Sequence, residues 1–356
     1  YLTKDGWIKR ITLEKLGDSI MAYKYINQAI KVDNKYMPAY IFGGEIQRVN
    51  YNIDRAIEWL RNGINAAPES PECYGALAKL YRLTKHNIGK AYSILDEMKS
   101  HVAEPLVNLE YARFYYDINE LPRSFNKYNN TFWNDSLLRN HFTETDLQNY
   151  CTSWHAVYNI DKDLITAQKK IVDKRIYDVA CYGLRLYPKN VALVRSAFYT
   201  LQRLGLNDSA KVYAEKLFVM PNTKFNTLDY LTYAKLYAAM GDLASADKMY
   251  REAYAMCMTR TDETRKESEN IESAGFLNFL QSQLDILKND EYVIINEHTR
   301  LYSQDYEKKI SIAQYYIDRK KSVNRTDYVD ELNQLGAALA AKAQSVDSTK
   351  MVDVWK

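Results

Sequence analysis

Six charged or aromatic residues recur at a fixed spacing in the N-terminal part of the chain. They are Glu45, Lys79 and Arg113, in steps of 34, and Arg48, Arg82 and Tyr116, also in steps of 34. Members of the two series lie three positions apart, so on a helix each such pair shares one face. Four of the six are cationic, and the planar guanidinium of arginine pairs bidentately with a carboxylate. The pattern predicts a row of cations that can receive carboxylate groups.

Patterns that indicate catalysis or metal binding are sparse. Cys151 and His155 are four apart and would share a helical face, as metal ligands must, but no further ligand accompanies them. No nucleophile elbow, phosphate loop or H-E-x-x-H sequence occurs. The four cysteines (Cys73, Cys151, Cys181 and Cys257) form no C-x-x-C pair. We therefore expect buried structural thiols, no metal, no cofactor and no enzymatic activity.

The composition favours an all-helical protein. Hydrophobic residues make up 47% and charged residues 26% of the 356, enough to bury a core. Twelve glycines and seven prolines are less than half of the roughly 12% that average usage gives, which disfavours turn-rich β-folds. The net charge of +3 disfavours a dedicated nucleic-acid binder. No stretch approaches the roughly 18 consecutive apolar residues of a membrane span.

Small residues recur with a nearly constant period. Ala22, Ala56, Ala91 and Ser124 follow one another in steps of 34, 35 and 33. Each opens a segment with apolar residues at helical steps, such as Leu60 after Ala56. A second segment precedes each of these, with aromatic and small residues at steps of three, one and three: Tyr40, Gly43, Gly44 and Gln47; Tyr74, Leu77, Ala78 and Tyr81; Asn108, Tyr111, Ala112 and Tyr115. Paired antiparallel helices are predicted.

This pattern resembles the tetratricopeptide-repeat family, whose unit is a helix-turn-helix of roughly 34 residues. A later match runs through Tyr230, Tyr233, Ala234, Tyr237, Gly241, Ala246, Tyr250 and Ala253. The resemblance covers about residues 3 to 258, with an irregular stretch between Phe132 and Asp173. It implies an all-α, right-handed α-α superhelix of about six to seven hairpins. We expect an N-terminal block over 1–135, a second block over 136–260, and a helical cap with a tail over 261–356.

The resemblance also implies a function. In this family the positions of Glu45, Arg48, Lys79, Arg82, Arg113 and Tyr116 line a concave groove that holds peptides. We therefore expect a non-enzymatic scaffold that receives a peptide or helical segment of a protein partner, with acidic groups on the four cations. Charge reversal of Arg82 and Arg113 together is expected to abolish capture. Ile11 and Glu14 replace the family's carboxylate clamp in the first unit, so chaperone-tail recognition is not implied.

Three alternatives remain open at the level of sequence. Glu45, Glu110 and Asp117 would neutralise the cations if this face were merely solvated. Trp133 and Trp154 would stack on sugars if the chain were a glycan-binding or small-ligand accessory of nutrient uptake. An enzyme site in the irregular stretch is the third. Segments 218–223 and 228–231 resemble envelope proteins of Gram-negative bacteria, which implies a periplasmic or outer-membrane-associated protein, the alternative being cytoplasmic; the oligomeric state is not indicated.

Overall fold

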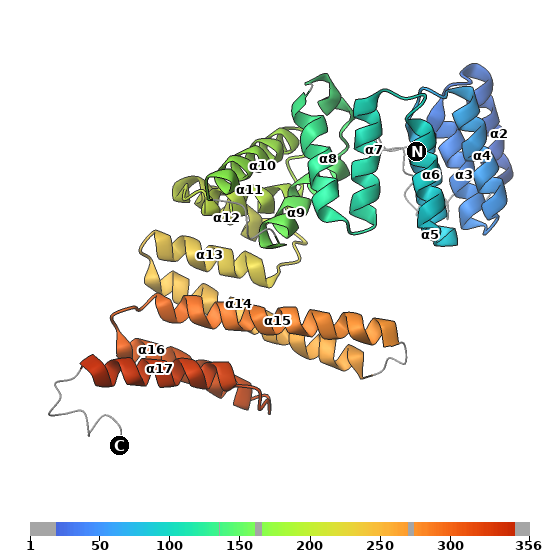
Figure 1. The fold of residues 1–356 in the computed structure, drawn as a ribbon. Helices are drawn as coiled ribbons and strands as arrows, with labels where there is room; N and C mark the ends of the chain where they lie inside the picture. The colour runs from blue at the N-terminus through green and yellow to red at the C-terminus, as the bar shows by residue number, and fades with distance from the viewer. Residues whose placement is uncertain (1–18, 135, 161–165, 270–273, 346–356) are drawn as a thin grey trace. The chain divides into compact units, whose positions relative to one another are not determined.

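The computed structural model describes residues 19–134, 136–160, 166–269 and 274–345, and all regular structure in these ranges is helical (Figure 1). The chain forms two compact units, Tyr1–Ala197 and Phe198–Lys356, which we call the N-terminal and C-terminal units. The division falls within α11 (Val191–Arg203). The predicted repeat blocks, with limits at 135 and 260, describe sequence pattern rather than compact units and stay a prediction.

The N-terminal unit is a series of helical hairpins. Its remaining helices are α2 (Ser19–Val32), α3 (Met37–Val49), α4 (Ile53–Ala66), α5 (Glu72–Lys85), α6 (Ile88–Met98), α7 (Glu104–Asp117), α8 (Leu121–Asn134), α9 (Glu144–Ile160) and α10 (Thr166–Leu186). Consecutive helices pack as the antiparallel pairs α3–α4, α5–α6, α7–α8 and α9–α10 (Figure 1). The predicted all-α architecture of repeated helical hairpins is confirmed. The leading helix expected near Trp7 and Ile11 lies outside the described residues.

The small residues of the repeat lie where neighbouring helices come closest. Ala56 on α4, Ala91 on α6 and Ala246 in the C-terminal unit are fully buried. Around the first two, Leu60, Ile64, Leu77, Ile94 and Leu95 belong to one apolar cluster that runs through three hairpins. A methyl group at these positions lets a partner helix approach, and larger side chains above and below fill the remaining space. The hairpins therefore bury their apolar faces in part against adjacent hairpins.

A residue with left-handed backbone closes the turn inside successive hairpins. Tyr51, His86 and Asn119 follow α3, α5 and α7 with φ of 60°, 46° and 61°. In the C-terminal unit Gly241 takes the same place after α13 (Thr227–Ala239), with φ of 81°. Glycine adopts this conformation at no steric cost, whereas tyrosine and histidine do so against their preference. The turn geometry thus repeats even where the sequence has lost the residue that favours it.

The irregular stretch contains a break between hairpins. A 3₁₀ helix, η1 (Leu137–His141), separates α8 from α9. Phe142 is buried directly after it, against Tyr128 and Phe132 of α8. The helix α9 then begins with a capping box, in which the Thr143 hydroxyl accepts from the backbone N–H of Asp146 and the Asp146 carboxylate accepts from that of Thr143. The predicted interruption of the array is therefore one extra turn between α8 and α9.

The C-terminal unit ends in longer helices. Beside α13 it contains α12 (Asn207–Val219), α14 (Leu243–Ser268), α15 (Ala274–Arg300), α16 (Tyr306–Lys321) and α17 (Val329–Ser345) (Figure 1). The sequence predicted helices over 271–288, 306–320 and 328–343. The last two match closely, but the first extends well beyond its predicted end, to Arg300, because buried side chains continue along the helix through Ile294, Ile295 and His298.

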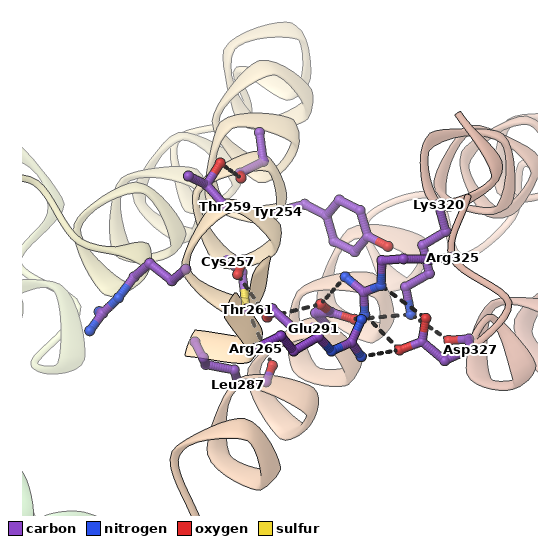
Figure 2. A network of polar contacts seen from close by, with 12 residues as sticks. Tyr254, Cys257, Thr259, Thr261, Arg265, Leu287, Glu291, Lys320, Arg325 and Asp327 are labelled. Carbon is purple, nitrogen blue, oxygen red and sulfur yellow. Dashed lines mark hydrogen bonds and ion pairs between the residues drawn. The ribbon is translucent and has the colours of Figure 1, made fainter. Parts of the chain in front are cut away.

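Buried charges fasten the turn between α16 and α17 to the preceding hairpin (Figure 2). Lys320 of α16 contacts Glu291 of α15 at 2.9 Å and Glu331 of α17 at 2.6 Å. Arg325 in the turn binds both oxygens of Glu291 and also reaches Asp327. Glu331 accepts a further hydrogen bond from Tyr254 of α14. The network joins four helices of this unit by charge-assisted hydrogen bonds, and of its carboxylate oxygens Glu331 Oε2 is buried without a hydrogen-bond partner.

Candidate peptide-binding groove

Consecutive hairpins place the six predicted groove residues at matching positions. Glu45 and Arg48 lie on α3, Lys79 and Arg82 on α5, and Arg113 and Tyr116 on α7. All six side chains are partly exposed. The helices that carry them are the first of each hairpin, and α5 packs against both α3 and α7. The row that the sequence predicts is therefore present as a half-buried strip of polar side chains.

Two of the cations in the strip are paired near the surface. Arg48 donates to both oxygens of Glu45 on its own helix, at 2.8 and 2.5 Å. Arg82 donates to Asp117 of α7 at 2.8 Å, so this ion pair joins neighbouring hairpins. These contacts are the neutralisation that the solvated-face alternative anticipates. A partner carboxylate must therefore compete with, or add to, an existing intramolecular pair.

Arg113 is held more deeply than the other cations. It donates to both oxygens of Asp146 at 2.9 and 2.6 Å and to Glu110 of its own helix. Asp146 and Glu110 are 2% and 6% exposed. Burial works to raise the pKa of Asp146, but Arg113 and the Thr143 hydrogen bonds outweigh it, so this pKa lies below its usual value. For Glu110 burial prevails and the pKa is raised.

A glycine on α5 makes room for this buried cluster. A methyl group built on Gly75 would overlap the Glu110 carboxylate, so the carboxylate keeps its present position between α5 and α7 only because this residue has no side chain. Glu110 in turn contacts Arg113, which reaches α9 through Asp146. Arg113 therefore links the hairpin of α7 to that of α9 through an ion pair, and it is also a member of the strip.

Sequence reasoning missed Asp146 and Thr152 as members of the strip. The Tyr116 hydroxyl lies 3.2 Å from the Thr152 hydroxyl on α9. Asp146 follows Arg113 after one more repeat period, so it continues the series of Glu45, Lys79 and Arg113. This spacing of 33 residues could have identified Asp146 as a member of the strip from the sequence. It was obscured because the polar run around Asp146 falls in the irregular stretch.

An open pocket of about 310 Å³ lies at one end of the strip. Glu45, Arg48 and Lys79 form its polar rim, and its apolar lining comes from Ile41, Phe42, Gly44, Leu60, Ala76, Leu80 and Leu83 of α3, α4 and α5. Leu83 is 44% exposed. Burial lowers the pKa of Lys79, although Asp117 and Glu45 act in the opposite direction. The structure thus brings three of the six predicted residues together around an apolar depression.

The aromatic residues proposed for sugar stacking lie differently from the expectation. Trp154 is 1% exposed and its indole N–H donates to Asp173 at 3.1 Å, so the expectation that it stacks on a sugar is wrong. It is buried because α9 packs between α8 and α10, with Phe125 against its ring. Trp133 is partly exposed, but its indole N–H donates a hydrogen bond to the Tyr150 hydroxyl. The guanidinium groups of Arg139 and Arg175 lie over its ring.

Cys151 and His155 were the candidate metal ligands, and the structure describes the side chain of the first. Cys151 is buried, and burial raises its pKa to about 12, which keeps the thiol protonated and unreactive. The His155 side chain lies outside the described residues. Where side chains are described, no three histidine, cysteine or acidic residues gather as metal ligands do. Nor does any described helix have both the length and the apolar character that crossing a bilayer needs.

Repeated hairpins of near-constant length, with small residues at the helix contacts and a polar strip on the first helices, define an all-α helical-repeat protein. The all-α fold of paired helices predicted from the sequence is confirmed. No family model matches the chain, and no curated protein matches it.

Several solved structures are similar in fold. One is Pseudomonas aeruginosa pilF, at 15% identity and a TM-score of 0.42, covering 61% of this chain and 89% of that one. Another is a tetratricopeptide repeat protein from Parabacteroides merdae, at 14% identity and a TM-score of 0.31, covering 71% of this chain and 98% of that one. A third is PilW, a type IV pilus biogenesis factor, at 16% identity and a TM-score of 0.28, covering 69% of this chain and 89% of that one.

Proposed function

We propose that the chain is a non-enzymatic scaffold that holds a peptide or helical segment of a partner protein along the strip from Glu45 to Tyr116. The observation that carries the proposal is the pocket between α3 and α5. It offers an apolar depression with exposed Leu83 beside the cations of Arg48 and Lys79. A pre-ordered surface of this kind binds an extended or helical segment at low entropic cost.

The contacts along the strip indicate what the segment carries. An apolar side chain fits the depression, and an acidic group beside it reaches Arg48 and Lys79. Lys79 suits this role because burial disfavours its charged form, and an incoming carboxylate restores part of the lost stabilisation. Arg113 contributes by fixing α7 against α9 through Asp146. The proposed partner is therefore a protein segment that pairs a large apolar residue with a neighbouring aspartate or glutamate.

Selection from a displayed random-peptide library tests this proposal. Peptides that combine an apolar residue with an adjacent acidic residue are expected to be enriched. Their affinity should fall about tenfold or more in the double variant Arg48→Met, Lys79→Met, because both charges are lost while the apolar stems remain. The control is Lys35→Met, since Lys35 is an exposed cation paired with Glu69 away from the pocket. Equal loss in the control, or enrichment of peptides without acidic residues, contradicts the proposal.

We extend the proposal to location: the protein acts in the periplasm or at the outer membrane. Its support is the resemblance of segments 218–223 and 228–231 to envelope proteins. Fractionation of the native source with an antibody against the chain tests it, because recovery in the cytosolic fraction alone contradicts an envelope location.

A further inference from the structure

A second and larger pocket opens in the N-terminal unit, away from the proposed groove. Its volume is about 520 Å³, within the range of small-ligand sites. It is lined by residues of α6, α7 and α8, with α7 contributing from Glu104 to Tyr115, and it shares no lining residue with the pocket at Lys79. Nothing in the peptide-binding proposal uses it.

Tyrosine rings form the apolar side of this pocket. Tyr92 comes from α6, and Tyr111 and Tyr115 from α7. The ring of Tyr115 lies 5.7 Å from that of Tyr111 and 6.3 Å from that of Tyr92. Tyr92 and Tyr115 are partly exposed, whereas Tyr111 is buried. The first two rings therefore offer amphipathic surface to a ligand, and their own packing fixes their orientation.

The polar side of the pocket offers donors and acceptors in balance. Asp96 accepts from Lys99 at 2.5 Å and from the Tyr111 hydroxyl at 2.7 Å. Lys127 donates to the amide oxygen of Asn108 at 2.6 Å, and both residues line the pocket, so the ammonium of Lys127 and the amide group of Asn108 bring further N–H donors to its lining. The ammonium groups of Lys99 and Lys127 also lie over the Tyr111 ring, at 5.0 and 5.8 Å from its centroid.

The charges in the lining cancel. Lys99 and Lys127 are opposed by Asp96 and Glu104, so no field of one sign selects an anion such as a phosphate or a polyacid. A ligand that fits must present groups that both donate and accept hydrogen bonds, together with an apolar face for the tyrosines. Neutral carbohydrate has this combination, because its hydroxyls do both and the C–H groups of its ring form an apolar face.

We propose that the pocket between α6, α7 and α8 is a binding site for neutral carbohydrate, stacked on Tyr92 and Tyr115 and hydrogen-bonded by Asp96, Asn108 and Lys127. The site differs from the one that the sequence suggested, since neither Trp133 nor Trp154 lines it. It is independent of peptide binding in the groove.

Isothermal titration of the full chain with a panel of oligosaccharides tests the site. The panel holds maltohexaose, cellohexaose, xylohexaose, laminarihexaose and chitohexaose, with oligogalacturonate as the acidic comparator. At least one neutral member is expected to bind at millimolar concentration or below. Tyr92→Ala and Tyr115→Ala should each weaken that binding about tenfold, whereas Tyr92→Phe should retain most of it because the ring stays. Helical circular dichroism verifies that each variant is folded.

The matched control is Tyr51→Ala, which removes a tyrosine that is 91% exposed in another hairpin. Three results overturn the proposal: no neutral member binds, oligogalacturonate binds in preference to all of them, or Tyr51→Ala weakens binding as much as the pocket variants do. In the variant Arg48→Met, Lys79→Met, sugar binding is expected to be unchanged.

Discussion

Arg325, in the turn between α16 and α17, binds Glu291 of α15 through two hydrogen bonds of 3.0 and 3.2 Å. Both side chains are almost fully buried, at 8% and 2% exposure. Lys320 contacts the same carboxylate at 2.9 Å (Figure 2). Removing the charge of this carboxylate would leave two desolvated cations, of which Lys320 would keep only Glu331 and Arg325 only Asp327 as ionic partners.

We predict that Glu291→Gln destabilises the C-terminal unit by about 3 to 5 kcal/mol, since Lys320 and Arg325 would remain buried without their shared carboxylate. Urea unfolding followed by circular dichroism measures the change. The control is Glu69→Gln, which breaks an exposed, solvent-screened ion pair with Lys35 at 2.7 Å and should change stability far less. Similar losses in the two variants would show that the buried network contributes no more than a surface pair.

A second prediction concerns Arg113 and Arg48, which occupy equivalent faces of α7 and α3. Arg113→Met is expected to cost about 3 kcal/mol or more, because Asp146 and Glu110 are buried and would lose their cation. Arg48→Met should cost about 1 kcal/mol or less, since its pair with Glu45 is half-exposed. Thermal unfolding compares the two. A large loss for Arg48→Met would mean that the strip is structural throughout and would weaken its assignment to ligand binding.

This difference changes how the groove should be tested. The sequence suggested reversing Arg82 and Arg113 together, but Arg113→Glu would place a third carboxylate beside Glu110 and Asp146. Loss of capture in that variant would report misfolding as readily as lost contacts. Arg48, whose pair with Glu45 is half-exposed, is therefore a better position than Arg113 for a test of the proposed binding.

The repeat itself was predictable from sequence because its signal is steric. Ala56 and Ala91 must be small wherever helices approach, so the requirement returns with each unit and is visible as a period. The partners of charged residues were harder to predict. Glu291 and Arg325 are separated by one repeat length, but they lie on a long helix and in a turn that share no repeat register. The pocket at Tyr92 and Tyr115 was hidden for another reason, because both residues occur among many tyrosines that serve packing.

A third prediction concerns close packing between hairpins. A methyl group on Gly63 of α4 would lie 2.5 Å from the Cys73 sulfur and 2.9 Å from the Tyr40 Cβ. Gly63→Ala is therefore expected to destabilise the N-terminal unit by about 1 to 3 kcal/mol. Gly336→Ala on α17 is the control, since nothing lies within 4 Å and helix propensity should add about 0.5 to 1 kcal/mol. The urea midpoints of the two variants should shift in opposite directions, and a neutral Gly63→Ala would contradict the packing.

His298 provides a final prediction, on the pH dependence of stability. Its ring is fully buried on α15, stacked on Tyr250, with Nε2 2.9 Å from Asp247 and Nδ1 2.7 Å from the Tyr316 hydroxyl. The neutral ring donates from Nε2 to the carboxylate and accepts from the tyrosine. Burial lowers its pKa, and the opposing attraction of Asp247 does not restore it. Asp247 itself stays ionised, because its hydrogen bonds to His298 and Arg251 hold its pKa well below the usual value.

The unfolded chain binds a proton at His298 near pH 6.5, whereas the folded chain resists doing so. The contribution to stability is therefore complete above about pH 6.5 and declines as the pH falls below it. In His298→Gln the same hydrogen-bonding space is filled by a group that does not titrate. Unfolding free energies of both proteins between about pH 5 and 8 should show a smaller loss on acidification in the variant. Parallel curves would mean that His298 binds its proton equally in both states, and that its contacts with Asp247 and Tyr316 do not select the neutral ring.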